Sequence, residues 1–424
     1  MKKLIFRIGA VIIFGIIITA TVITAIRDNG WGSYSRASAE ITGGEPLVKF
    51  GQVSYNRLTR PQQYIYDSIC DAIEDDFADL TEEMPFVAQI EDVTLAVDAL
   101  KNDRPEYFYI DAEKFSLGEY YYVELQSDDE ETTVTEHRGD SIKNGKYTIL
   151  QVHYTDTREE LVKKKTRLNA AVSKAMSLID TSKSDIERLT LLHDYIAEIC
   201  ERAENTTPEH PETVSNAYGA LVDGCADSVG YHKALKLLLN KAEMVSHIVN
   251  GSVRGRQSVW CVVLVDDKYY NTDVYEDDLD SSVNGETMRG VYTHAYLNVS
   301  DEAISSTHTN KEQNAPKCTD NETYYTLCAL QAAGQGAVKS IVDRQMKSFV
   351  KYKKNYIEIY CDFELDETFL AETVRSSFLE EYTEYTPQGV SCTVIKPFAQ
   401  FNAYTVRIDY EIVQTPAETV QNSV

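Results

Sequence analysis

The stretch GCADSVGYHKALKLLLNKAEM, residues 224–244, decides the fold that we expect for this chain. A glycine and small residues come first, as in a tight turn. Apolar residues then follow at the three- and four-residue spacing of an amphipathic helix. Asp and Ser are favoured at helix N-caps, so Asp227 and Ser228 predict where the helix begins. The dipole of such a helix favours negative charge at its N-terminus. The candidates for a nucleophile there are Ser228 and, three residues earlier, Cys225.

The composition sets the class of protein and excludes some partners. The chain has 424 residues, of which 43% are hydrophobic, which is enough for two or three domains with large cores. Its net charge of −26 repels nucleic acid and anionic lipid, so we expect no nucleic-acid partner. Eight cysteines permit disulfides without showing any pairing. No cysteine or histidine cluster has the spacing of a metal site, so we expect no metal and no cofactor.

The N-terminus predicts a membrane anchor. Ile8–Ile26 comprises 19 uncharged, mostly apolar residues, preceded by Lys2, Lys3 and Arg7. This pattern favours an uncleaved, single-pass signal anchor in the cell membrane, with the N-terminus inside and the bulk of the chain extracytoplasmic. The alternative is a signal peptide cleaved near Ala37–Ala39. The expected segments are a cytoplasmic tail at 1–7, the anchor at 8–26 and a linker at 27–47.

The remainder of the chain predicts an α+β protein in three parts. Helical and strand-like patterns alternate throughout, with loops rich in Gly, Pro and acidic residues between them. Two helices are expected at Arg158–Ile179 and Ser184–Cys200. Two strands joined at Asp266–Asp267 are expected in SVWCVVLVDDKYYNTDV. The parts that we expect are an N-terminal α+β region at 48–180, a core at 181–310 and a small α+β domain at 335–424.

Six motifs in the core and before it resemble one family in their order. NAYGALVDG leads into GYHKALKLLLNKAEM, and SVWCVVLVDDKYYNTDVYEDDLD and HAYLNVSDEAISSTHT follow. Upstream, ERLTLLHDYIAEIC and ALKNDRPEYFYI complete the match, which spans most of 60–310. The segment 215–310 resembles the transglutaminase-like superfamily, the papain-like fold of some bacterial extracytoplasmic peptidases. The resemblance implies a helix packed on an antiparallel sheet.

The resemblance also implies a catalytic triad, of which this chain keeps one member. The family places a Cys at the start of the helix, a His on the next strand and an Asp on the strand after it. Those positions fall on Ser228, Ser258 and Asp273. The family's Trp near the His is present as Trp260, which we expect to line the cleft. A Ser hydroxyl is a poor nucleophile without a base. In a serine protease, loss of the nucleophile or the base costs a factor on the order of 10⁶ in turnover.

Other residues offer a substitute for the missing pair. Cys225 is a displaced candidate nucleophile. His232 follows Ser228 by four residues, so its ring can lie near the hydroxyl. His247 and His294 lie on expected strands. Against these stands the plainer interpretation that Ser228 only caps a helix and that His232 packs in the core. The acidic EDDLD after Asp273 lacks the Gly and Glu spacing of an EF-hand, so it favours a solvated loop over a calcium site.

Three functions remain open from the sequence. The first is a membrane-anchored, extracytoplasmic transglutaminase-like protein that has lost catalysis and binds a protein, a peptide or a cell-wall peptide. The second is an active cysteine- or serine-dependent hydrolase or transpeptidase that uses Cys225 or Ser228 with a non-standard base. The third is a structural surface protein whose contacts are made by the C-terminal part.

Overall fold

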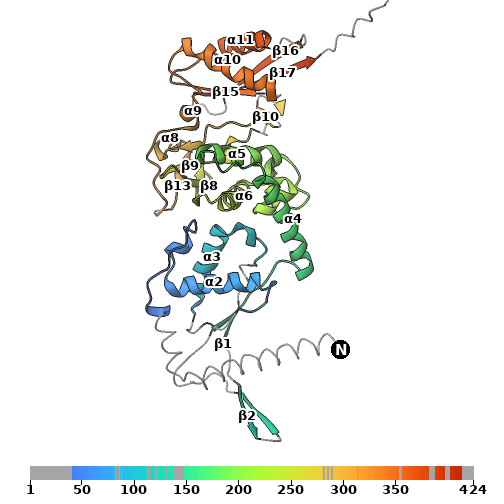
Figure 1. Cartoon of the computed structure of the whole chain (residues 1–424), viewed down its shortest axis with the longest axis vertical. Helices are drawn as coiled ribbons and strands as arrows, with labels where there is room; N and C mark the ends of the chain where they lie inside the picture. Colours follow the sequence, from blue (N-terminus) through green and yellow to red (C-terminus); the bar gives the residue numbers. More distant parts are fainter. Residues whose placement is uncertain are drawn as a thin grey trace, which may run out of the picture. The chain divides into compact units, whose positions relative to one another are not determined.

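A computed structural model describes the chain in two compact units, Met1–Lys165 and Thr166–Val424 (Figure 1). The described residues are 41–412, without 82–83, 85, 87, 112–113, 115, 120–122, 129–130, 137–147, 280–281, 284–285, 288–289, 313, 353–355, 382–386 and 397–401. The division between the units falls inside helix α4 (Arg158–Met176). Each unit has its own hydrophobic core.

The first unit is built around two packed helices. α2 (Arg60–Glu74) begins with a capping box between Thr59 and Gln62, and its apolar residues face α3 (Ile90–Asp103). The other described elements are η1 (Tyr55–Arg57), η2 (Pro105–Tyr107), the antiparallel pair β1 (Ser116–Glu119) and β4 (Thr148–Gln151), and the hairpin of β2 (Val123–Asp128) and β3 (Glu131–Glu136).

The centre of the second unit is a helix packed on a five-stranded antiparallel sheet. α6 (Ser228–Lys241) contacts two of these strands and buries Tyr231, Leu235 and Leu238 completely. α5 (Asp185–Ile199) packs against α6. The strand order is β12 (Leu297–Val299), β9 (Lys268–Thr272), β8 (Arg256–Val265), β7 (Ser246–Val253), β13 (His308–Asn310). The predicted α+β class, with a helix on an antiparallel sheet, is confirmed.

Short elements connect this sheet to its surroundings. The parallel pair β5 (Glu201–Arg202) and β6 (Cys225–Ala226) precedes α6, as do η3 (Ala203–Asn205) and the π-helical turn η4 (Gly219–Asp223). Along the chain, the elements that follow β9 outside this sheet are α7 (Val274–Asp277), the pair β10 (Ser282–Val283) and β11 (Glu286–Thr287), α8 (Asp301–Ile304) and α9 (Tyr324–Leu327).

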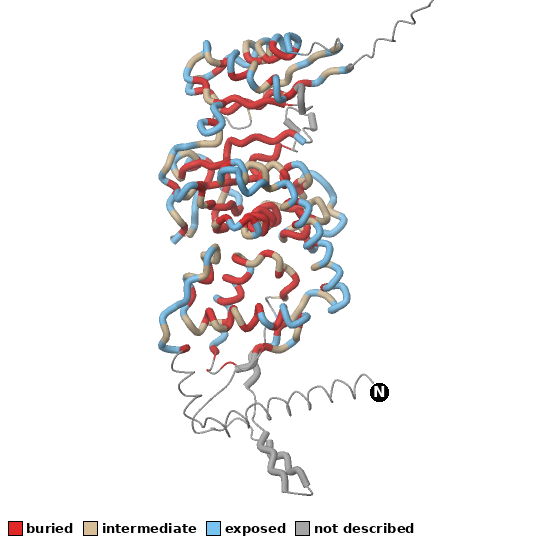
Figure 2. Tube along the Cα trace, viewed as in Figure 1, coloured by how far each residue is buried: buried red, intermediate tan, exposed pale blue. Residues whose placement is uncertain are grey.

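The C-terminal part of the second unit is a four-stranded sheet with two helices against it. The strand order is β14 (Gln331–Ala332), β15 (Tyr356–Cys361), β17 (Ala403–Ile412), β16 (Pro387–Ile395), and the helices are α10 (Gln335–Tyr352) and α11 (Glu367–Glu381). One hydrophobic core continues from Trp260 and Val262 through Tyr325 to Ile359 and Val406. Figure 2 shows the buried residues along α6 and both sheets. The C-terminal part therefore shares its core with the central sheet.

The prediction of a membrane anchor requires a correction. Within the part of the chain that the structure describes, no helix is long and apolar enough to cross a bilayer. A span needs about 20 predominantly apolar residues. The longest described helices, α4 and α10, have 19 and 18 residues and carry charged side chains along their length. This finding contradicts the predicted transmembrane helix, the membrane partner and the single-pass localisation, which we do not retain. The segment 8–26 itself lies outside the described residues.

Candidate functional site

Ser228 lies at the N-terminal end of α6, held by neutral partners. The Asp227 side chain caps the helix by accepting a hydrogen bond from the Gly230 N–H at 3.0 Å. The Ser228 Oγ lies 2.7 Å from the Ser258 Oγ on β8 and 3.0 Å from the Val259 carbonyl oxygen. Among the described residues, no ring nitrogen or carboxylate makes a hydrogen bond with this hydroxyl. The two predicted positions are therefore adjacent, and neither supplies a base.

His232 lies one turn after Ser228 and is fully buried. Its Nδ1 lies 2.7 Å from the Ser228 carbonyl oxygen, and a carbonyl only accepts, so Nδ1 carries the hydrogen. Its Nε2 lies 3.3 Å from Oδ1 of Asp273. The ring thus lies between the backbone of α6 and the Asp273 carboxylate, and among the described residues it makes no hydrogen bond with the Ser228 hydroxyl.

Asp273 directly follows β9 and caps α7. Its Oδ1 accepts a hydrogen bond from the Glu276 N–H at 2.9 Å, and its Oδ2 lies 3.0 Å from Nε2 of His308. Burial raises the pKa of Asp273, but the charges and hydrogen bonds of His232 and His308 outweigh burial and hold this pKa well below its usual range. Asp273 is therefore an ionised acid between two imidazoles.

His308 is the residue of this group that sequence reasoning missed. It is buried on β13, which pairs with β7 at the edge of the sheet. The rings of Trp260 and His308 pack edge to face with their centroids 5.0 Å apart, and the centroid of the Tyr296 ring lies 4.9 Å from that of His308. The only signal was its presence in the motif HAYLNVSDEAISSTHT. The structure thus places an acid, an imidazole and a tryptophan together, with the imidazole on β13 and not at position 258.

Trp260 and Cys225 occupy different environments. Trp260 is 1% exposed, donates from Nε1 to the Asn271 Oδ1 at 2.8 Å, and packs closely over Gly251. Cys225 is half-buried on β6. Burial and the nearby carboxylates of Glu201 and Asp223 raise the pKa of its thiol. A reactive cysteine needs the opposite shift.

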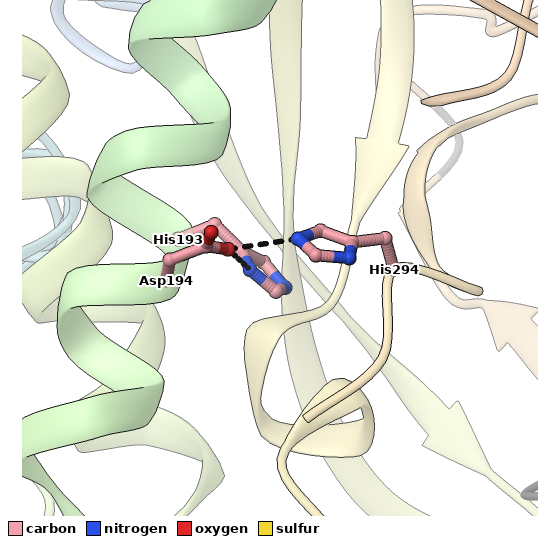
Figure 3. A group of neighbouring side chains, drawn as sticks. All are labelled: His193, Asp194 and His294. Carbon is pink, nitrogen blue, oxygen red and sulfur yellow. Dashed lines mark hydrogen bonds and ion pairs between the residues drawn. The ribbon is translucent and has the colours of Figure 1, made fainter. Parts of the chain in front are cut away.

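The two other histidines considered from the sequence lie in other contacts. His247 Nε2 lies 2.8 Å from Oε2 of Glu312. His294 belongs to a separate buried group with His193 and Asp194 (Figure 3). Each member of that group offers one ligand atom, and these atoms lie within 4.8 Å of one another. In the described part of the chain this is the arrangement that can hold a metal ion.

Comparisons with known proteins give structural neighbours alone. No family model matches the chain, and no curated protein matches it. A solved TGase shares 12% identity over 45% of this chain and 49% of its own, with a TM-score of 0.24. A proposed cysteine protease from Cytophaga hutchinsonii shares 9% over 51% of this chain and 84% of its own, with a TM-score of 0.23. A proposed protease from Parabacteroides distasonis shares 12% over 72% and 65%, with a TM-score of 0.21. The chain spans about half the length of the TGase.

Proposed function

We propose that this chain is a catalytically silent member of the transglutaminase-like superfamily that binds a protein or peptide ligand at the N-terminal end of α6. One observation carries the loss of catalysis. The Ser228 hydroxyl bonds to the Ser258 hydroxyl and the Val259 carbonyl, and neither group accepts a proton near neutral pH. A serine attacks a carbonyl only when an adjacent base removes its proton.

The imidazoles near this site are committed elsewhere, which argues against the active alternative. His308 contacts Asp273 through Nε2 and the Thr307 hydroxyl through Nδ1. His232 uses Nδ1 for the Ser228 carbonyl. Cys225, the other candidate nucleophile, has a raised pKa and so a smaller thiolate fraction than a free cysteine. The active hydrolase would need at least one of these side chains to change partners.

The ligand class follows from exposure and charge. Residues 222–225 and 227–229 are half-buried, whereas the rest of α6 is mostly buried, so this end of the helix offers surface to a ligand. The chain carries a net charge of −26, which favours a neutral or basic partner over an acidic one. The family resemblance of the motifs supplies the expectation that the ligand is a polypeptide.

The first experiment tests the loss of catalysis. Purified protein is treated with a fluorophosphonate probe or with iodoacetamide, and mass spectrometry measures labelling of Ser228 and Cys225. We expect no probe on Ser228 and alkylation of Cys225 no faster than that of a free cysteine, because no base activates either group. Incorporation of a fluorescent amine into casein should not exceed the protein-free rate. Labelling of Ser228, or rapid alkylation of Cys225, would establish the active alternative.

The second experiment tests binding. Dye-labelled tryptic peptides of casein serve as the probe, and fluorescence polarisation reports saturable binding. We expect Ser228→Trp to weaken binding at least tenfold, because the indole would occupy the surface at the N-terminal end of α6 where the ligand is proposed to bind. Ser173→Trp, on the exposed face of α4, is the matched control and should bind as the unmodified chain does. Equal affinity in both variants would place the ligand elsewhere and contradict the proposed site.

A further inference from the structure

The group of His193, Asp194 and His294 involves no residue of the Ser228 site. His193 and Asp194 are neighbours on α5, and His294 lies shortly before β12. The Asp194 Oδ1 lies 3.1 Å from Nδ1 of His193 and 2.8 Å from Nε2 of His294. Figure 3 shows the two rings approaching the Asp194 carboxylate from these different elements. Two ring nitrogens therefore approach one carboxylate oxygen, and the three atoms lie within 4.8 Å of one another.

The outer nitrogen of each ring faces another carboxylate. Nε2 of His193 lies 3.2 Å from Oδ2 of Asp277, and Nδ1 of His294 contacts Glu358. Histidines that bind metals almost always direct their second nitrogen to a carboxylate or carbonyl, which fixes the tautomer. In a neutral ring the outer nitrogen then carries the hydrogen, and the inner nitrogen turns its lone pair toward Asp194. A protonated ring instead donates its inner N–H to Asp194, so a metal ion bound here takes the place of that proton.

The outer carboxylates are themselves fixed. Asp277 accepts hydrogen bonds from the Tyr296 N–H at 3.0 and 3.2 Å. Glu358 accepts from the His294 N–H at 3.0 Å and from the Tyr325 hydroxyl at 3.1 Å. The ring of Tyr324 stacks on that of His294 at 4.0 Å between centroids. Both imidazoles are thus oriented before any ligand arrives, which is the arrangement that metal sites require.

We propose that His193, Asp194 and His294 bind one divalent transition-metal ion, with zinc as the best match. Two imidazoles and one carboxylate suit zinc and its neighbours. Zinc bonds of about 2.0–2.2 Å place tetrahedral ligand atoms about 3.3–3.5 Å apart. The ring nitrogens of His193 and His294, which lie 3.1 and 2.8 Å from the Asp194 Oδ1, would therefore move away from that oxygen by roughly 0.2–0.7 Å. The Asp194 side chain is 23% exposed, which gives an ion access from solvent, whereas the two rings are buried.

The proposed ion has a structural role. Its ligands join α5 to the segment before β12, and Glu358 connects the same point to β15 of the C-terminal sheet. A bound ion therefore stabilises the contact between these three segments of the second unit. No spacing pattern marks this site in the sequence, because His193 and Asp194 are adjacent and the third ligand comes 100 residues after Asp194.

The test uses the full chain, stripped with EDTA, dialysed and titrated with cobalt(II) or zinc. We expect one ion per chain by elemental analysis, a higher melting temperature, and cobalt d–d bands without thiolate charge transfer. Asp194→Asn should weaken affinity at least tenfold, because it removes the anionic ligand while keeping its shape. Glu312→Gln is the matched control: it also neutralises a carboxylate beside a buried histidine, His247, but lies outside the group and should bind metal normally.

Three results would overturn the site. They are no bound ion at micromolar cobalt or zinc, a thiolate charge-transfer band that assigns the ion to cysteines, and unchanged affinity in Asp194→Asn. If a variant fails to fold, the cobalt spectrum of the unmodified chain still shows whether an ion binds and whether cysteines are among its ligands. None of these results depends on the function proposed for Ser228.

Discussion

Glu312 shows how one carboxylate can link distant residues and make stability depend on pH. It contacts Nε2 of His247 at 2.8 Å and accepts hydrogen bonds from the Asn250 N–H at 3.0 Å and the Asn250 side chain at 2.8 Å. Burial raises the pKa of Glu312, but the hydrogen bonds from His247 and Asn250 outweigh burial and lower this pKa to about 2. The contacts hold the segment after β13 against β7.

These contacts predict a pH-dependent contribution to stability. The folded pKa of about 2 lies below the unfolded value of 4.5, so the stabilisation is complete above about pH 5 and is lost as the pH falls toward 2. We expect Glu312→Gln to lower the free energy of unfolding by roughly 2–3 kcal/mol at pH 7. Urea unfolding at pH 7, 5 and 3 should show the difference from the unmodified chain shrinking by about half between pH 5 and 3. A constant difference would mean that Glu312 contributes packing and not charge.

Only some residues of the candidate site could be predicted from the sequence. Ser228 and Ser258 followed from the order of the motifs, and their hydroxyls lie 2.7 Å apart. His308 could not be identified in this way. It lies on β13, whereas Asp273 follows β9, and the strands β8 and β7 stand between those two in the sheet. A contact made by side chains across two intervening strands leaves no spacing in the sequence.

At the scale of elements, α6 depends on a glycine that allows close packing. A Cβ at Gly230 would lie 2.3 Å from the Val214 carbonyl oxygen and 2.7 Å from the Ala226 Cβ, so no side chain fits there. Gly336 on α10 is the contrasting case, since a Cβ there would meet nothing within 4 Å. The two glycines lie in helices but serve different purposes.

Alanine substitutions should therefore act in opposite directions. We expect Gly230→Ala to destabilise the chain by about 1–3 kcal/mol or more, because the backbone of residue 214 must shift. Gly336→Ala should stabilise it by up to about 1 kcal/mol, because alanine loses less backbone entropy in a helix. Thermal melting of both variants at one pH measures the difference. A stable Gly230→Ala protein would show that α6 does not pack against residue 214 as described.

The longer elements could be predicted and the shortest could not. The helix whose start was predicted at Asp227 and Ser228 begins at Ser228, and the one predicted at Ser184–Cys200 spans Asp185–Ile199. The predicted turn at Asp266–Asp267 joins β8 to β9 with positive φ angles of 47° and 65°. β13 has only three residues, and it is held by pairing with β7 and not by a local pattern. Periodicity needs more residues than such strands contain.

At the scale of the molecule, the second unit joins two sheets through one core. Val249, Trp260 and Val262 of the central sheet belong to the same buried cluster as Val342 and Val406 of the C-terminal part. The buried Glu358 of β15 accepts hydrogen bonds from the His294 N–H and the Tyr325 hydroxyl. The sequence could not reveal this, because periodicity shows which face of an element is apolar but not which element covers it. The separate domain expected at 335–424 remains a prediction.

The shared core predicts how fragments of the chain behave. We expect the fragment 158–424, which begins with α4, to melt in one cooperative transition. The fragment 158–330, which lacks β14–β17, α10 and α11, should lose cooperative melting and near-ultraviolet circular dichroism. This shorter fragment lacks Ile359 and Val406, so the apolar residues that they cover become exposed. It also lacks Glu358, so the buried His294 N–H loses its hydrogen-bond acceptor. A fragment 158–330 that melts as sharply as 158–424 would show that the C-terminal part is an independent domain, because the central sheet would then be stable without the partners that bury it.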